Sequence, residues 1–237
     1  MNPADPLVFD YIPNTGSMSG ILELAARYNY DVVVKPLKGT GGINVTRTTT
    51  AKEIESAVYK CWSRDYGVAI SPFVDIIDEI RVVVFLGSVR LMYRKRRVSV
   101  ESDGSKTVQD LIREKIASSD PSHIRPLAKA LCSLSPVELK KVPLPGETVP
   151  IEWRHNLGLG ASAEVCECPE AAHIAQAAAR ALNMKFCSVD LVMLSDNSLL
   201  VLEVNSGVMM DSFLKSSKEN GSIAKQIYTD VITHSLA

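Results

Sequence analysis

The sequence is poor in aromatic residues and histidines, and it has no long hydrophobic run. Aromatic side chains make up 6% of the 237 residues, and only 4 residues are histidines. No apolar run approaches the roughly 18 residues that a membrane-spanning helix requires. The N-terminus is acidic and interrupted by prolines, whereas a secretory signal is basic and then apolar. We therefore expect a cytoplasmic protein that does not use a membrane.

The sequence also lacks an excess of charge of either sign. Its 26 basic residues nearly balance its 27 acidic residues, which leaves a formal net charge of −1. Such a chain has no overall field that would attract nucleic acid or an anionic membrane. Any anionic ligand must therefore be bound by a local arrangement of charges, and a nucleic-acid partner is not expected.

The cysteines do not suggest a disulfide framework. There are 5 of them, an odd number, scattered through a chain that is long enough to bury a core without crosslinks. Reduced, buried thiols fit this pattern better. Cys166 and Cys168 form an isolated CxC, which is too little to predict a metal site.

The hydrophobic pattern alternates between helical and strand periods, which indicates an α+β or α/β protein. The expected helices are 18–28, 51–62, 107–117, 170–182 and 222–236. The expected strands are 31–36, 67–71, 79–86, 89–97, 186–194 and 199–205. Residues 98–150 hold six of the 12 prolines, and we interpret them as an insertion with too few core residues to fold alone. Residues 151–165 are expected to form a strand followed by a glycine-rich loop.

Two apolar stretches near the C-terminus, separated by Ser-Asp-Asn-Ser, predict a β-hairpin. Pairing Leu194 with Leu199 places Asp190 directly opposite Glu203, and alternation puts Asn205 on the same face. Directly opposed carboxylates repel each other, and a cation between them removes that cost. Oxygen ligands of this kind suit Mg²⁺. A solvated acidic edge is the alternative.

A second expected hairpin brings arginines together. Pairing Leu86 with Val89 places Arg81 opposite Arg94, on the same face as Glu79. Adjacent guanidinium groups suit a phosphate or a carboxylate. The alternative is a lattice of surface salt bridges around Glu79. Alternation also divides the run YRKRR between two faces, which argues against a targeting signal or a nucleic-acid patch.

Lys35 ends an expected strand, and the glycine-rich loop 37–42 follows it. Glycines allow backbone N–H groups to approach phosphate oxygens, and a lysine adds a mobile positive charge. The loop matches neither the dinucleotide pattern, because Asn44 replaces the last glycine, nor the P-loop. A plain glycine turn is the alternative.

Together these three elements resemble the ATP-grasp superfamily, in particular cyanophycin synthetases, bacterial glutathione-forming synthetases and RimK-type ligases. Their phosphate loop is resembled by VVVKPLKGTGGINV. Their ribose-side strand is resembled by EIR, and the strand that returns beside it by YRKRR. Their two metal-binding strands are resembled by VDLVM and LEVNSG. The resemblance covers about residues 18–236. It implies an α+β, ATP-grasp fold with a small lobe at 16–74 and a large lobe at 75–237, the latter with an insertion at about 98–150. It also implies that the usual N-terminal substrate domain is lacking.

The resemblance implies roles for individual residues as well. ATP phosphates would be bound by Lys35, Gly39, Thr40, Gly41 and Gly42. Adenine would contact the backbone of Ser71, Pro72, Phe73 and Val74, with Glu79 on the ribose. Arg154 and Asn156 would lie beside the transferred phosphoryl group, and the expected arginine pair adds Arg81 and Arg94 as catalytic candidates. The alternative for Arg154 is a surface arginine that bridges to Glu152 or Glu164. Mg²⁺ would be held by Asp190, Glu203 and Asn205.

The implied activity is an ATP- and Mg²⁺-dependent ligation of a carboxylate to an amine through an acyl phosphate. The substrates would be small molecules or peptides. One alternative is a phosphotransferase that uses the same cleft on a hydroxyl group. Another is a nucleotide-binding subunit that is inactive until a partner chain supplies a substrate domain. The sequence leaves open whether the chain forms a homo-oligomer.

Overall fold

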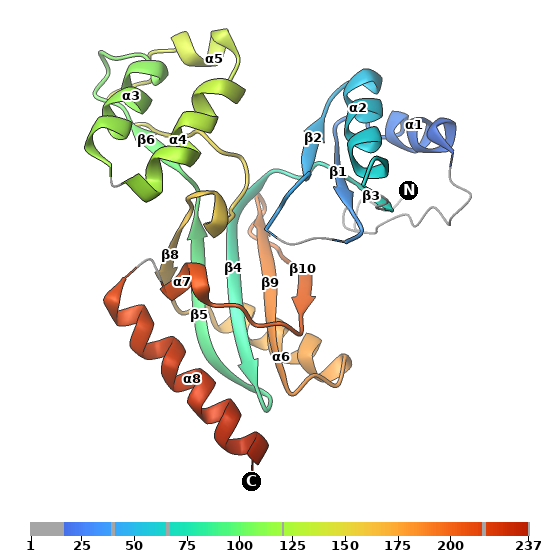
Figure 1. The fold of residues 1–237 in the computed structure, drawn as a ribbon, viewed down its shortest axis with the longest axis vertical. Coiled ribbons are helices and arrows are strands. Elements are labelled where there is room, and N and C mark those ends of the chain that lie inside the picture. The colour runs from blue at the N-terminus through green and yellow to red at the C-terminus, as the bar shows by residue number, and fades with distance from the viewer. Residues whose placement is uncertain (1–16, 39–40, 65–66, 120, 215–216, 237) are drawn as a thin grey trace. The chain divides into compact units, whose positions relative to one another are not determined.

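A computed structural model describes residues 17–38, 41–64, 67–119, 121–214 and 217–236. The chain divides into two compact units, the first ending at Asp75 and the second beginning at Ile76. Each unit has its own antiparallel sheet (Figure 1). Within the described ranges, no helix is both long enough and apolar enough to span a membrane.

The first unit is a three-stranded sheet, in the order β2-β1-β3, with two helices. Its elements are α1 (Met18–Ala26), β1 (Val32–Pro36), β2 (Thr46–Thr48), α2 (Ala51–Trp62) and β3 (Val68–Pro72). Helix α2 begins where the Thr50 side chain accepts a hydrogen bond from the Glu53 backbone N–H. Its apolar stripe is buried in the core of this unit, as the helical spacing predicts: Ile54, Ala57, Val58 and Cys61.

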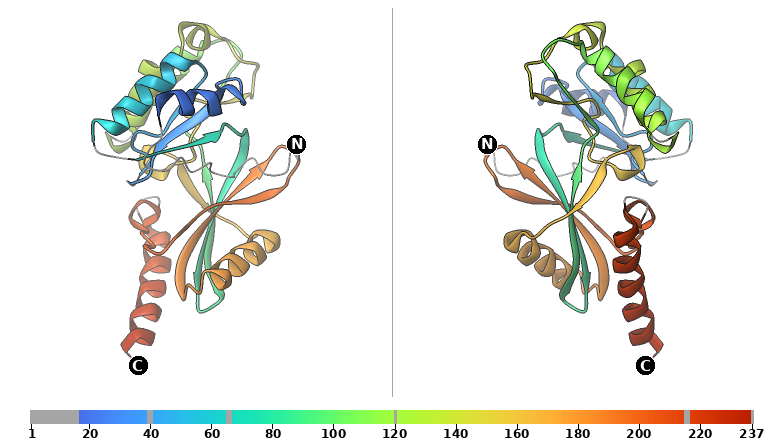
Figure 2. Two further views of the ribbon diagram at one scale, coloured as in Figure 1. Left: turned by 90° about the vertical axis from the view of Figure 1, so that its right-hand side faces the viewer. Right: turned by 90° about the vertical axis from the view of Figure 1, so that its left-hand side faces the viewer.

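The second unit contains a five-stranded sheet in the order β10-β9-β4-β5-β8. The strands are β4 (Ile76–Phe85), β5 (Ser88–Arg96), β8 (Ser162–Val165), β9 (Phe186–Leu194) and β10 (Leu199–Asn205). Helix α6 (Pro169–Ala181) packs on one face, while α7 (Asp211–Leu214) and α8 (Lys218–Leu236) pack on the other (Figure 2). Alternate strand residues therefore enter two separate cores, one on each face of the sheet.

The insertion has a hydrophobic cluster of its own. It consists of β6 (Ser99–Glu101), α3 (Val108–Ser118), α4 (Pro121–Ser133), α5 (Pro136–Lys140) and β7 (Thr148–Pro150). Strands β6 and β7 pair, and buried residues such as Val100, Ile112 and Leu127 pack together. The insertion thus has more buried apolar residues than expected, and that it cannot fold alone stays a prediction. Helices α4 and α5 were not predicted from the sequence.

The expected strand at the start of 151–165 does not form. Strand β7 ends at Pro150, residues 151–156 are irregular, and a short 3-10 helix, η1 (Leu157–Leu159), precedes β8. The irregular stretch is fixed by contacts with distant residues, among them the Ile151 N–H, which donates to the Val98 carbonyl. The short elements β2 and α7 were not predicted either.

Candidate functional site

Asp190 lies directly opposite Glu203 on strands β9 and β10, as the sequence predicts. The register of the hairpin near its turn differs from the expected one. The structure pairs Leu199 with Met193, one residue away from the expected register, and a bulge at Leu202 then restores the alignment. The two carboxylates therefore share one face of the large sheet.

Asn205 belongs to the same constellation, because its Nδ2 donates a hydrogen bond of 3.0 Å to Glu203 Oε1. Asp190 is 1% exposed, whereas Glu203 is open to solvent. In the described part of the chain, no group of three or more His, Cys, Asp or Glu side chains could hold a metal ion. The third ligand of the predicted set is an amide, and an all-oxygen set of this kind suits Mg²⁺.

The expected pairing of Arg81 with Arg94 is wrong. Arg81 lies opposite Tyr93 on β5, and Arg94 lies on the other face of the sheet. The turn is Leu86-Gly87, whose φ angles of 49° and 76° are both positive, and it begins one residue earlier than expected. A bulge further along the hairpin shifts the register again. The two guanidinium groups therefore cannot form one anion site.

Arg94 instead lies near Asp78, with 3.3 Å between Arg94 Nε and Asp78 Oδ2. Its backbone neighbour across the hairpin is Ile80, which is buried against α6. Arg94 thus lies on the face opposite Asp190. Its proposed catalytic role depended on a position beside Arg81, which the structure does not show.

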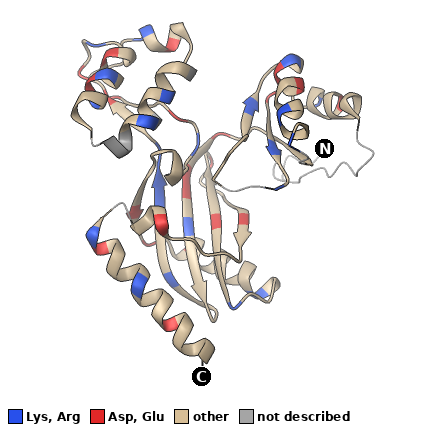
Figure 3. Cartoon of the chain, viewed as in Figure 1, with Lys and Arg blue, Asp and Glu red and all other residues tan. Residues whose placement is uncertain are grey.

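Arg81 is bonded to Asp190 in a bidentate ion pair. Its Nε and Nη2 atoms donate to the two carboxylate oxygens at 2.6 and 2.5 Å. Lys95 Nζ lies 3.1 Å from Asp190 Oδ1 and also pairs with Glu79. These residues form a mostly buried set of two cations and two carboxylates, here called the Asp190 network: Glu79, Arg81, Lys95 and Asp190. Figure 3 shows opposite charges gathered on neighbouring strands of this sheet.

Burial and charge act in opposite directions within the network. Burial raises the pKa of Glu79 to about 7, although Lys95 opposes the shift. Burial also favours neutral Asp190, but the hydrogen bonds from Arg81 and the charge of Lys95 outweigh it and lower the pKa of Asp190. The two acids likewise raise the pKa of Lys95 against the effect of its burial. Asp190 is therefore ionised at neutral pH and Lys95 is charged.

Arg154 and Asn156 lie in the irregular stretch after β7, so strand alternation does not govern their side chains. Arg154 forms a bidentate pair with Glu152, with distances of 2.8 and 2.7 Å, and both side chains are 15% exposed. Asn156 caps η1, where its Oδ1 accepts from the Gly158 N–H at 2.8 Å. His155, between them, is buried, and its Nδ1 bonds the Lys95 carbonyl at 2.7 Å.

Lys35 lies next to the last residue of β1, where it pairs with Ala69 of β3. This agrees with a lysine at a strand end. Gly41 and Gly42 follow in a turn with φ angles of 69° each, a conformation that glycine adopts readily. Gly39 and Thr40 lie outside the described residues.

The segment predicted to contact adenine is the end of β3 and the residues after it. The Phe73 N–H donates to the Asp31 carbonyl at 3.0 Å, and the Arg47 guanidinium lies over the Phe73 ring, 3.5 Å from its centroid. Ser71 is buried and Pro72 ends the strand, while Val74 is half-buried. The segment thus has a defined backbone in the first unit.

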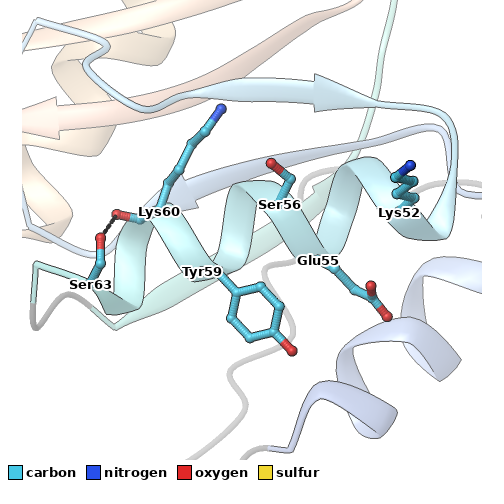
Figure 4. A pocket seen from close by; sticks show the side chains of 6 residues that line it. All are labelled: Lys52, Glu55, Ser56, Tyr59, Lys60 and Ser63. Carbon is cyan, nitrogen blue, oxygen red and sulfur yellow. Dashed lines mark hydrogen bonds between the residues drawn. The ribbon is translucent and has the colours of Figure 1, made fainter.

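One hollow does not coincide with any predicted site residue. It is an open depression of about 500 Å³ along the outer side of α2 (Figure 4). Its lining consists of Lys52, Glu55, Ser56, Tyr59, Lys60 and Ser63. A shallow depression lined by one helix has few convergent polar groups. We therefore assign no ligand to it.

Two residues of the site were missed by sequence reasoning, Lys95 and His155. Lys95 was assigned to the apolar face because the hairpin register was wrong by one residue, and a shift of one residue exchanges the faces. The turn at Leu86-Gly87 alone would pair Lys95 with Asp78, still on the apolar face, and only the bulge between Val83 and Val84 brings Lys95 to the face of Arg81. No local signal in the sequence identifies the contact of His155 with β5.

Comparisons with known proteins find similar sequences and a similar fold. Residues 147–231, which include Arg154, Asp190 and Glu203, match the model of a RimK-like ATP-grasp domain. A glutathione biosynthesis bifunctional protein of Listeria welshimeri is 28% identical over 182 residues. That alignment covers 68% of this chain and 23% of the relative, so the chain spans about a quarter of the relative's length.

Solved structures are similar in fold. The D-alanine–D-alanine ligase of Bacillus anthracis superposes with a TM-score of 0.50 and 18% identity, over 85% of this chain and 52% of that one. A bifunctional glutathione synthetase from Pasteurella multocida gives a TM-score of 0.45 and 16% identity, over 90% of this chain and 33% of that one. By its α+β architecture, its sheet topology and these matches, the chain has the ATP-grasp fold and resembles the ATP-grasp ligases.

Proposed function

We propose that this chain is an ATP- and Mg²⁺-dependent carboxylate–amine ligase that acts through an acyl phosphate. The observation that supports this most is the direct pairing of Asp190 with Glu203, with Asn205 bonded to Glu203 on the same face. These residues lie in the segment that matches the RimK-like ATP-grasp domain. The similarity to glutathione-forming and D-alanine ligases supports the same reaction class.

In the proposed reaction, a substrate carboxylate oxygen attacks the γ-phosphorus of ATP, which forms an acyl phosphate and releases ADP. The amine then attacks the acyl carbon, and inorganic phosphate leaves with the bonding electrons. Both steps develop negative charge on oxygen atoms, so they need positioned positive groups rather than a protein nucleophile. Lys35 and the glycine loop would bind the phosphates, and Arg154 and Asn156 would lie beside the transferred phosphoryl group.

The predicted ligands Asp190, Glu203 and Asn205 would hold Mg²⁺, which neutralises charge on the triphosphate oxygens when bound. Their oxygen atoms are of the kind that this ion prefers, and exposed Glu203 would offer it the most accessible carboxylate. Arg81 bonds both oxygens of Asp190 and keeps this carboxylate ionised and oriented. Glu79, predicted to bind the ribose, is buried beside Lys95, and its contact with nucleotide stays a prediction.

The deciding experiment measures phosphate release from ATP with Mg²⁺ and a panel of amino acids and short peptides, added singly and in pairs. A ligase releases phosphate only when both an acid and an amine are present, and mass spectrometry detects the amide. A phosphorylated hydroxyl product would instead identify a phosphotransferase. Binding of ATP and Mg²⁺ without turnover, followed by turnover after addition of a co-purifying chain, would identify a nucleotide-binding subunit. Absence of ATP binding would refute the proposal.

A further inference from the structure

Lys95 connects two parts of the candidate site that are distant in the sequence. Its Nζ reaches Asp190 at 3.1 Å and also pairs with Glu79. Its backbone carbonyl accepts a 2.7 Å hydrogen bond from His155 Nδ1. One residue of β5 therefore contacts both the carboxylate proposed to bind metal and the segment that carries Arg154 and Asn156.

His155 is suited to fix that segment. The residues around it form no strand, so no ladder of backbone hydrogen bonds holds them to the sheet. The imidazole is 6% exposed, and besides the Lys95 carbonyl it lies near the backbone of Ile76, the first residue of β4. Since a carbonyl can only accept, Nδ1 carries the proton in this bond. Burial of the ring lowers the pKa of His155, which favours the neutral form.

We propose that His155 is a positioning residue: its Nδ1–H bond to Lys95 holds Arg154 and Asn156 in a fixed place relative to Asp190. This inference rests on the proposed function for its catalytic consequence, although the positioning itself does not require turnover. A displacement of about 1 Å in a phosphoryl-transfer site can lower the rate by about a hundredfold. A flexible segment without this bond would therefore be costly to catalysis.

The test compares His155→Asn with His155→Gln and His155→Leu. The asparagine amide can take the place of Nδ1 and donate to the Lys95 carbonyl, whereas the glutamine amide corresponds to Nε2 and leucine has no donor. His173→Leu, at an exposed histidine of α6, is the matched control. Thermal unfolding shows which variants fold, and the glutamine variant keeps the test valid if the leucine variant does not.

The first measurement is acrylamide quenching of Trp153 in a Trp62→Phe background. The chain has 2 tryptophans, so Trp153 is then the single reporter, and it lies next to Arg154, whose guanidinium is 5.4 Å from the ring centroid. We expect His155→Gln and His155→Leu to increase the quenching constant and His155→Asn to keep it near the parent value. Equal quenching in all variants would overturn the inference.

The second measurement is turnover with ATP and Mg²⁺, together with calorimetric binding of ADP and Mg²⁺. We expect His155→Gln and His155→Leu to lose about tenfold or more in kcat at near-parent nucleotide affinity, with rescue by His155→Asn. An equal loss of kcat in His155→Asn would show that the packing of the imidazole ring, and not its hydrogen bond to Lys95, controls turnover, and it would overturn the inference. If the parent chain neither binds nor turns over ATP, the proposed function fails, while the quenching result still decides the positioning role.

Discussion

At the scale of single residues, charge and exposure determine which side chains are free to bind a ligand. Glu203 is exposed, whereas Asp190 is buried and bonded by Arg81 and Lys95. A substitution at Asp190 therefore breaks the Asp190 network and the metal site together, but one at Glu203 leaves the contacts of Asp190 with Arg81 and Lys95 in place.

We expect Glu203→Gln to weaken or abolish the Mg²⁺ dependence of ATP binding at an unchanged melting temperature, because an exposed carboxylate contributes little to the free energy of unfolding. The double variant Asp190→Asn/Glu203→Gln should abolish that dependence. Calorimetry with and without Mg²⁺ measures both effects. Glu101→Gln, an exposed carboxylate on β6, is the control. Identical ATP affinity with and without Mg²⁺ in the parent chain would contradict the metal assignment.

Lys35→Ala should weaken nucleotide binding by about 1.5–3 kcal/mol, the range of a charge-assisted hydrogen bond. The prediction rests on its position next to the last residue of β1, ahead of the turn that contains Gly41 and Gly42. Calorimetric titration measures the loss, and Lys60→Ala on the outer side of α2 is the control. A collapse of the melting temperature without ATP would mean that Lys35 is structural.

Arg154→Ala should keep most ATP affinity and lose about a hundredfold or more in kcat, because a group that acts on developing charge lowers kcat with little change in KM. The bidentate contact with Glu152 holds the guanidinium in one orientation before any ligand arrives. Steady-state kinetics measures the change, with exposed Arg113→Ala as the control. Near-normal kcat would remove Arg154 from the mechanism and direct attention to Arg81.

At the scale of elements, the large sheet combines two apolar faces with a strip of buried charge. Tyr93 lies where the apolar core meets the buried charges. Its ring stacks on Phe213, with 4.9 Å between the ring centroids, and its neighbour across the hairpin is Arg81 of the Asp190 network. Buried ion pairs are expensive to form and more expensive to break by removal of one partner. The network therefore couples the stability of the central strands to the candidate site.

We expect Lys95→Met to lower the free energy of unfolding by about 3–5 kcal/mol, because it leaves the buried Glu79 without its cation and Asp190 with Arg81 alone. The double variant Glu79→Gln/Lys95→Met should recover part of that loss. Chemical denaturation of the single and double variants measures the coupling, and Lys115→Met on α3 is an exposed control. Additive effects would show that Glu79 and Lys95 do not stabilise each other.

At the scale of the whole molecule, each of the four hydrophobic clusters in the described part of the chain draws its residues from one unit only, either before or after the boundary at residues 75 and 76. The cluster around Ile54 and Val58 is built only from the first unit, and the other three are built only from the second. Each unit thus contains a core of its own, which is the physical requirement for independent folding.

A fragment that begins at Ile76 should therefore fold alone, with a cooperative thermal transition. It should bind ATP more weakly than the full chain, because Lys35 and the glycine loop are missing. Circular dichroism and calorimetry measure the two properties. A fragment without a cooperative transition would show that the second unit depends on the first.

Several features follow from the sequence alone because they depend on short-range periodicity. The bounds of α2, β9 and β10 are those expected. Asp190 also lies opposite Glu203 as expected, but only because a bulge at Leu202 restores that pairing. The match of VDLVM and LEVNSG to metal-binding strands, and of a strand-end lysine to a phosphate loop, led to the ATP-grasp fold that the structure has. Local alternation and loop spacing predict the elements, and the resemblance to the ATP-grasp superfamily implies the fold.

Other features were decided only by tertiary structure. The turn at Leu86-Gly87 and a bulge, neither visible in the hydrophobic pattern, moved Arg94 away from Arg81 and brought Lys95 into the site. His155 is fixed by a residue 60 positions away. A bulge changes the register by one residue at little local cost, and a contact between distant segments depends on packing energy summed over the whole sheet, so periodicity along the chain cannot reveal either one.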